Sequence, residues 1–494
     1  MCSILLNLIL TIILGVLSSI YYILRLQELN VKFLKSFTIL GISGAFIDFF
    51  LNINRYIPHR LPSQPSDTIL IFVTQLILFI SLGILLLGVQ YKPKDLIELE
   101  SPTILRSRKG TIEIGTIINQ KGRDHKFYLS LSDLEKHMFV CGATGTGKSN
   151  FVQNFLIKLT EKHDIPFLLV EFKGEYIFLQ NKIDDMLVLR PGENFSLNIF
   201  NPEGTNPEIH AERIFDILKS GQFLDDTAEY SPQMQKVLVD ILIDVCKNRE
   251  YRNWKGFYMK CTEYLKNKQK SIPMLAQTLI SIKNRIRRFS VGPLKEIFEM
   301  NKAIKVRELF HTNILMDLSS IIRLGGEKED ALFFLNMILK YLWDKNLTEG
   351  GKNYEGIKHI TIVEDAQYFA PQELVKQTKL TTYLEDIALL QRGTGECLIS
   401  IATRPTVSED ILANCGILVV FKTHMQGGLQ CELLNLSEEN RDYLSMLETG
   451  TCIIRVNSIK RPFLLRSRHL PRKSLTNSQI SRNNRTVLHS KTIE

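Results

Sequence analysis

Eight consecutive residues, Gly142–Ser149, have the composition and spacing of a phosphate-binding loop. They match the pattern G-x-x-x-x-G-K-S/T in full, between an apolar run at 137–141 and a helical apolar pattern that starts after Asn150. The glycines let backbone N–H groups surround phosphates, Lys148 can reach the β- and γ-phosphates of ATP, and Ser149 can hold Mg²⁺. The sequence therefore predicts an ATP site formed by Gly142, Ala143, Thr144, Gly145, Thr146, Gly147, Lys148 and Ser149.

A second apolar run, 359–363, ends in two neighbouring carboxylates, Glu364 and Asp365. A phosphate-binding loop needs such an acidic element on a nearby strand. We predict that Glu364 joins Ser149 in holding the Mg²⁺ shell, and that Asp365 polarises the attacking water. An ordinary strand end with solvated acids fits the same short pattern, but the loop upstream favours the catalytic interpretation.

Two further segments carry polar residues at predicted strand ends. Glu171 lies at the end of the predicted strand 166–172 and Glu175 follows it, and both could face the nucleotide. A plain turn that pivots on the intervening glycine explains them almost equally well. Arg392 and Thr403 flank the strand 397–402. Thr403 could sense the γ-phosphate, and Arg392 could reach a neighbouring subunit's site as an arginine finger.

Strand and helix patterns alternate around these segments. This alternation predicts an α/β fold with a mostly parallel sheet. The stretch 206–300 interrupts it with long helical patterns, which we interpret as a helical insertion in an ATPase domain that spans 136–456. The predicted strands are 137–141, 166–172, 186–189, 313–318, 359–363, 397–402, 416–421 and 451–456.

Three apolar stretches, 4–24, 33–53 and 68–90, predict a transmembrane region of two or three helices in residues 1–90. The first and third are free of charge, whereas the middle one contains Lys35 and Asp48. No basic segment precedes the first stretch, which argues against a cleaved signal peptide. The distribution of Lys and Arg predicts a multi-pass protein of the cell (inner, or cytoplasmic) membrane with a cytosolic ATPase domain.

The remaining segments flank the predicted ATPase domain. Residues 91–135 suggest a small β element and linker, because short alternating runs begin near Thr111. Residues 457–494 contain nine Lys and Arg against one Glu, within a formal net charge of +9 for the chain, and are predicted to be a disordered tail. The eight cysteines are scattered, which favours buried reduced thiols over disulfides or zinc.

The set of motifs, taken in order, resembles the HerA/FtsK superfamily of P-loop ATPases, and most closely the HerA-type enzymes and the TraD/TrwB-like coupling proteins of conjugative type IV secretion. The resemblance covers about Thr111 to Val456. Its carriers are the segment 134–149, Glu-Phe-Lys-Gly-Glu-Tyr at 171–176, Ser-Leu-Asn-Ile-Phe-Asn-Pro at 196–202, Val-Glu-Asp-Ala-Gln at 363–367, Arg-Gly-Thr-Gly at 392–395 and Ala-Thr-Arg-Pro at 402–405.

This resemblance implies a RecA-like core that assembles as a ring, commonly a hexamer, with ATP between subunits. Lys148, Ser149, Glu364 and Asp365 match the family's phosphate, magnesium and water-activating positions. Arg392 matches the trans-acting arginine, whereas Thr403 falls where relatives often have glutamine. Many relatives have Asp-Glu or Glu-Glu in place of Glu364-Asp365, and Asp is common in place of Glu171.

Three functions fit the sequence. The first is a membrane-anchored, ATP-driven DNA translocase, acting on double-stranded DNA and possibly coupled to a conjugation or secretion pore; family analogy favours it. The second is an ATPase that powers protein secretion or pilus assembly. The third is a membrane-tethered NTPase switch in defence against foreign DNA. The basic tail does not discriminate among them, because such segments bind anionic lipid as readily as nucleic acid.

Overall fold

The computed structural model describes residues 99–119, 123–220, 230–292, 294–299, 306–348, 356–372, 379–424, 427–437 and 440–493. The three predicted membrane spans, including Asp48, lie outside these ranges. Within them, no helix is both long and apolar enough to cross a bilayer. The chain divides into two units, Met1–Ile97 and Glu98–Glu494, and the fold described below is that of the second.

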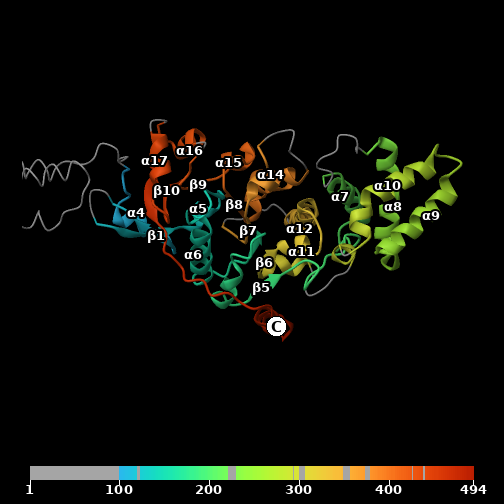
Figure 1. The fold of residues 1–494 in the computed structure, drawn as a ribbon, viewed down its shortest axis with the longest axis horizontal. Coiled ribbons are helices and arrows are strands. Elements are labelled where there is room, and N and C mark those ends of the chain that lie inside the picture. Colours follow the sequence, from blue (N-terminus) through green and yellow to red (C-terminus); the bar gives the residue numbers. More distant parts are fainter. Residues whose placement is uncertain are drawn as a thin grey trace, which may run out of the picture. The chain divides into compact units, whose positions relative to one another are not determined.

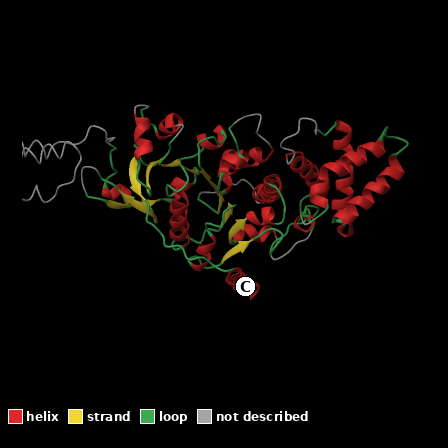
Figure 2. Cartoon of the chain, in the orientation of Figure 1, coloured by secondary structure: helices red, strands yellow, loops and turns green. Residues whose placement is uncertain are grey.

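Eleven strands of this unit form one sheet, in the order β2-β1-β11-β10-β9-β3-β8-β7-β4-β6-β5 (Figures 1 and 2). The strands from β9 to β5 in this order are parallel, and the strands on the other side pair antiparallel. The predicted α/β class with a mostly parallel sheet is therefore confirmed. The eight predicted strands correspond to β3 (Met138–Cys141), β4 (Phe167–Glu171), β5 (Met186–Leu189), β6 (Asn313–Asp317), β7 (His359–Val363), β8 (Glu396–Ala402), β9 (Ile417–Phe421) and β10 (Thr451–Val456).

Alternate side chains of the parallel strands enter two separate hydrophobic cores, one on each face of the sheet. In β3, Met138 and Val140 pack with the helix α6 (Lys148–Thr160), whereas Phe139 and Cys141 join the opposite core. That opposite core contains the long helix α12 (Lys328–Thr348). Burial on both faces explains why these strands are apolar throughout.

The antiparallel side of the sheet differs from the prediction of a separate β element and a disordered tail. Strands β1 (Ile112–Ile117) and β2 (His125–Leu129) join the main sheet through β11 (Phe463–Arg466), which pairs with both β1 and β10. Phe463, Leu464 and Leu465 are all buried. A three-residue apolar run within a basic segment is a weak local signal, because its burial depends on strands far away in the sequence.

The predicted disorder is also wrong for the end of the chain, where α18 (Asn477–Ile493) packs against the edge strand β5. The Asn484 side chain accepts hydrogen bonds from Val188 N at 3.0 Å and Gln180 Nε2 at 2.7 Å, and it donates to Val188 O at 2.7 Å. Asn484 thus supplies the acceptor for the N–H group of an edge-strand residue, and it shares the carbonyl oxygen of that residue with Asn194, which donates to it at 3.0 Å. The helix carries few apolar residues, so its sequence resembled a solvated tail.

Four helices occupy the predicted insertion: α7 (Pro207–Ser220), α8 (Pro232–Lys247), α9 (Trp254–Lys268) and α10 (Leu275–Ser290). The first packs against α12 and α14 (Lys379–Leu390) of the core, and the other three pack against one another (Figure 1). The seven described cysteines are free and buried, as predicted.

Replacing Asn484 with Ala should destabilise the fold by about 1–3 kcal/mol, because it leaves the buried N–H group of Val188 unpaired. Urea denaturation measures this change. The matched control is Thr486→Ala on the exposed side of the same helix, which should leave the unfolding free energy nearly unchanged. Equal effects of the two substitutions would contradict the assigned role of Asn484.

Candidate nucleotide site

In the loop between β3 and α6, the residues at both ends adopt backbone conformations that favour glycine. Gly142 and Gly147 have φ of +150° and +120°. A Cβ on Gly142 would lie 2.6 Å from the Cβ of Phe421, and one on Gly147 would lie 3.1 Å from the Cα of Gly450. The loop therefore passes close to β9 and to the turn before β10, and it delivers Lys148 and Ser149 into the first turn of α6.

Lys148 is buried and lies against its own loop. Its Nζ donates to Gly142 O at 2.8 Å and Ala143 O at 3.1 Å, and burial lowers the pKa of its ammonium. Peptide carbonyls are neutral acceptors, so a bound phosphate would offer this cation a stronger, charged partner. The loop thus fits a nucleotide phosphate, with the backbone N–H groups at the start of α6 adding positive potential.

Glu364 meets Ser149 because only β8 separates β7 from β3 in the sheet. Ser149 Oγ donates to Glu364 Oε1 at 3.4 Å, whereas the other carboxylate oxygen, Oε2, is buried without a hydrogen-bond partner among the described residues. Burial, and then the nearby carboxylate of Glu175, raise the pKa of Glu364 to about 7. An orphaned carboxylate oxygen beside a serine hydroxyl is a donor set that fits Mg²⁺.

Asp365 is held by a cation that sequence analysis did not single out. Lys173 Nζ lies 2.8 Å from Asp365 Oδ2, and Gln367 Nε2 donates to Asp365 Oδ1 at 3.2 Å. The same Gln367 accepts a hydrogen bond from the backbone N–H of Thr403 at 3.3 Å. Thr403 therefore lies beside the site, at the end of the strand between the loop and Glu364. The signal for Lys173 was its place inside the 171–176 motif.

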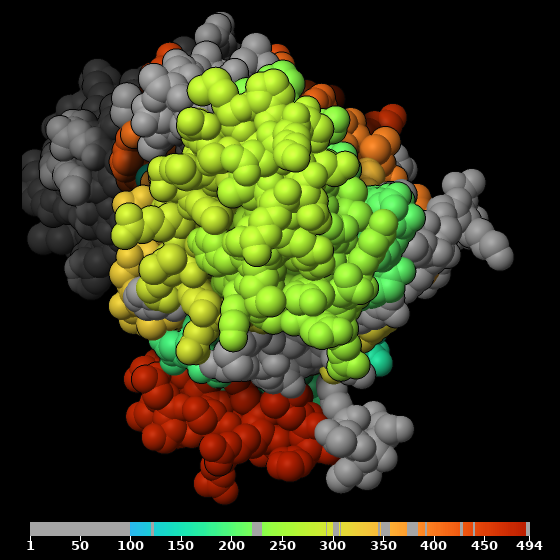
Figure 3. Space-filling view, turned by 90° about the vertical axis from the view of Figure 1, so that its right-hand side faces the viewer, coloured from blue at the N-terminus to red at the C-terminus, as the bar shows by residue number. Residues whose placement is uncertain are grey.

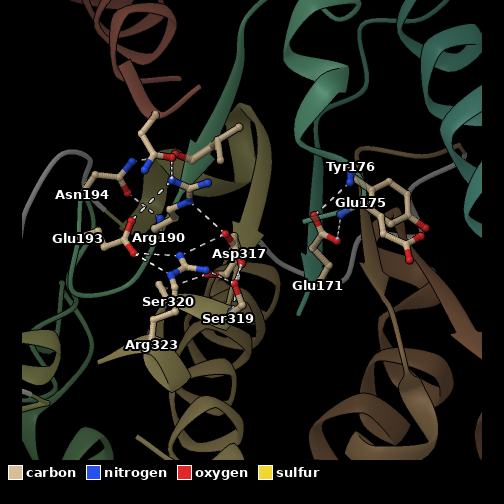
Figure 4. Close-up of polar contacts among 12 residues, drawn as sticks. Glu171, Glu175, Tyr176, Arg190, Glu193, Asn194, Asp317, Ser319, Ser320 and Arg323 are labelled. Carbon is tan, nitrogen blue, oxygen red and sulfur yellow. Dashed lines mark hydrogen bonds and ion pairs between the residues drawn. The ribbon is translucent and has the colours of Figure 1, made fainter. Parts of the chain in front are cut away.

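Glu171 stabilises the backbone that follows β4. It accepts hydrogen bonds from the N–H groups of Glu175 at 2.8 Å and Tyr176 at 3.2 Å (Figure 4). Burial, and then the charge of Glu364, raise the pKa of Glu171 to about 8. The structure therefore favours the turn interpretation for Glu171. Glu175 remains partly exposed near Arg472, at 3.9 Å.

Arg392 is not brought into the site of its own chain. Its backbone lies in the 3-10 helix η8 (Gln391–Thr394), directly before β8. The phosphate-binding loop follows β3, which runs parallel to β8. Arg392 therefore lies at the amino ends of the parallel strands, whereas Lys148 and Glu364 lie at their carboxyl ends. Any contact between Arg392 and nucleotide would therefore involve another subunit.

An ion-pair network centred on the buried Asp317 lies at the carboxyl ends of the same parallel strands, and sequence analysis missed it (Figure 4). Asp317, at the end of β6, accepts from Arg190 Nε at 3.0 Å and lies 3.6 Å from Arg323. Glu193 contacts both arginines, at 3.6 Å and 2.9 Å. Arg190 also donates to Asn477 at the start of α18. Widely separated residues of common types leave no local pattern to detect.

The raised pKa of Glu364 predicts how the stability of the magnesium-free protein depends on pH. The folded state holds this proton up to about pH 7, whereas the unfolded chain releases it near 4.5. The unfolding free energy should therefore fall, by up to about 3 kcal/mol, as pH rises through this window. Glu364→Gln should reduce the fall in urea titrations and leave the part caused by the raised pKa of Glu171, whereas the exposed control Glu212→Gln should leave the whole fall unchanged.

The Lys173–Asp365 ion pair predicts a specific kinetic defect. Lys173→Gln should lower kcat for ATP hydrolysis about ten- to hundredfold, because Asp365 loses the contact that orients it. The KM for ATP should change little, since Lys148 and the loop remain intact. Steady-state kinetics of the variant, compared with Lys182→Gln as a surface control, measure this split. An unchanged kcat would contradict a positioning role.

Comparisons with known proteins show which families the chain is similar to. A family model described as the central domain of the helicase HerA matches residues 112–347. The chain is 25% identical over 373 residues to the DNA double-strand break repair helicase HerA of Sulfurisphaera tokodaii, which covers 72% of this chain and 69% of that protein. The HerA of Sulfolobus acidocaldarius is also 25% identical, over 378 residues.

Solved structures share the fold. VirB4 of Thermoanaerobacter pseudethanolicus superposes with a TM-score of 0.56 at 14% identity, covering 74% of this chain and 98% of that one. The bacterial conjugative coupling protein TrwB superposes with a TM-score of 0.52 at 12% identity, covering 71% and 88%. One TrwB structure holds ADP and Mg²⁺. At these identities the likeness is one of fold.

Proposed function

We propose that the chain, which is similar to HerA over most of its length, is a membrane-anchored P-loop ATPase of the HerA/FtsK type. It would use ATP hydrolysis to translocate double-stranded DNA. The observation that carries the proposal is the convergence of Lys148, Ser149 and Glu364 at the carboxyl edge of the sheet. The substrate is inferred from the similarity to a DNA repair helicase over most of the chain.

Each residue of the site has a separate task in this proposal. Lys148 and the loop backbone bind the phosphates, and Ser149 and Glu364 hold Mg²⁺. The ion, when bound, neutralises charge that develops on the phosphoryl oxygens. Asp365 accepts a hydrogen bond from the attacking water and so orients it, while Lys173 and Gln367 fix the position of Asp365. Thr403 senses the γ-phosphate through its link to Gln367.

The proposed motor is a homo-oligomeric ring, with six subunits and ATP bound between neighbours. The place of Arg392, at the opposite ends of the parallel strands from its own loop, supports a role in the neighbouring site. Arg392 would then act as the arginine finger that stabilises transition-state charge across the interface.

The membrane anchor is part of the proposal. The stretches 4–24 and 68–90 are apolar, uncharged and long enough to span a bilayer, and 33–53 is a third candidate. Lys92 and Lys94 follow the last stretch, together with Arg106, and this excess of cations favours a cytosolic motor domain in the cell membrane. A conjugation- or secretion-type pore is the kind of partner such an anchored motor would serve.

A protein-secretion ATPase is the second candidate, supported by the fold shared with VirB4. A membrane-tethered switch is the third. The experiment that separates them is ATP hydrolysis by the full-length chain in detergent, with and without double-stranded DNA, at low and physiological salt. We expect DNA to stimulate hydrolysis several-fold at low salt, and less at higher salt, because phosphate contacts are salt-sensitive.

Lys148→Ala supplies the blank, since it removes the cation expected on the phosphates and should abolish hydrolysis. Lys182→Ala, an exposed lysine outside the site, should behave as wild type. Hydrolysis that is independent of DNA at every salt concentration would overturn the DNA translocase and favour a protein-export motor. Biological activity that survives Lys148→Ala would instead favour a switch that needs no hydrolysis.

A further inference from the structure

Part of the helical insertion carries a large excess of positive charge. Residues 249–290 contain eleven Lys and Arg against two Glu, an excess as large as the formal net charge of the whole chain. The helices α8, α9 and α10 form the yellow-green surface at the centre of Figure 3. This part of the molecule is therefore a strongly basic lobe, separate in sequence from the basic tail.

Some of these cations are neutralised within the protein. Lys260 pairs with Glu263 at 2.8 Å and lies over the ring of Tyr251. Arg288 pairs with Glu327 and Asp330. These contacts hold the lobe together and leave little positive charge for a partner.

Other cations of the lobe have no ion-pair partner among the described residues. Lys255 and Lys266 lie on α9, and Lys270 lies in the turn directly after it; all three are exposed. The spacing of eleven residues places Lys255 and Lys266 on one side of α9, opposite the buried Phe257 and Cys261, and Lys270 follows two residues after the helix ends. We call Lys255, Lys266 and Lys270 the lysine face. Arg249 and Arg287 are further exposed cations nearby in sequence, also without such a partner.

We propose that the lysine face binds the phosphate backbone of double-stranded DNA outside the ATPase core. Lys255 and Lys266 are separated by about 16 Å along the helix axis, at 1.5 Å per residue. One strand of B-DNA presents about five phosphates over that length, at 3.4 Å each. The inference rests on the proposed function, because it names the surface that would hold that motor's DNA.

The chemistry of the lobe favours duplex over single-stranded DNA. Single-strand binding uses exposed aromatic rings on which bases stack. Trp254 and Phe257 are buried, and the hydroxyls of Tyr258 and Tyr264 are bonded to Ser290 and Asp240. Contacts from lysine ammonium groups to phosphates remain, and these carry no sequence information.

A membrane surface is a less suitable partner. An interfacial helix inserts a broad apolar face into the headgroup layer. The apolar side of α9 is instead buried in the core that the lobe shares with α12. Of the exposed large apolar residues of the lobe, Met259 (52% exposed) lies on α9, whereas Met274 (70%) and Ile280 (58%) lie at the start of α10 and within it.

The test compares the full-length chain with a variant carrying Lys255→Gln, Lys266→Gln and Lys270→Gln. The matched control carries Lys109→Gln, Lys162→Gln and Lys182→Gln, which remove the same charge from exposed positions elsewhere. The probe is a short labelled duplex of random sequence, titrated at several salt concentrations. Removing three phosphate contacts should reduce the slope of log K against log salt by up to about 2.7, and weaken binding at low salt at least about tenfold.

Hydrolysis without DNA should stay unchanged in both variants, since none of the six lysines lies in the nucleotide site, and neither variant should unfold at a lower temperature than the wild type. A lysine-face variant with the wild-type salt slope would overturn the inference; if DNA still stimulates wild-type hydrolysis, the proposed function stands. Loss of binding to anionic lipid vesicles, with duplex binding intact, would also overturn it and assign the face to a membrane. A wild-type chain that neither binds duplex nor responds to it would overturn both.

Discussion

The site depends on the burial of three carboxylates at the carboxyl ends of neighbouring parallel strands. Glu171, Asp317 and Glu364 follow or end neighbouring strands, and each is nearly inaccessible to solvent. A buried carboxylate is costly unless it is paired, hydrogen-bonded or protonated. Glu171 is satisfied by two backbone N–H groups, and Asp317 by arginines. Only Glu364 has an oxygen without a partner, and it is the carboxylate expected to hold a metal ion.

Hydrogen bonds also link the nucleotide site to the end of the chain. Asn150 and Asn154, on α6, donate to the backbone oxygen of Arg468, and Asn150 accepts from the N–H of Leu470. The segment then continues to α18, whose Asn484 pairs with the edge strand β5. Because these bonds are buried or partly buried, the helix behind the phosphate-binding loop and the C-terminal segment cannot move independently without breaking them.

How far the sequence predicts this structure depends on the range of the interactions involved. The loop 142–149 and the eight apolar strands carry local signals, and the structure places Ser149 against Glu364 as their order in a parallel sheet requires. The strand β11 and the helix α18 are held by distant partners, so composition alone suggested disorder. Lys173 lay inside a recognised motif, but its contact with Asp365 required the turn after β4 to be folded.

Whether a basic residue has an acidic partner depends on its position in the fold, which composition does not give. The basic tail and the basic lobe carry similar excesses of charge, yet parts of the tail are already engaged, since Arg472 lies near Glu175 and the tail backbone is bonded to α6. In the lobe, acids are scarce and the lysines of one helix side lack partners among the described residues. Unpaired like charges repel one another and disfavour a compact helical bundle. A polyanion on the lysine face would relieve that repulsion, whereas three arginines of the tail, Arg461, Arg466 and Arg472, already lie near carboxylates of the chain.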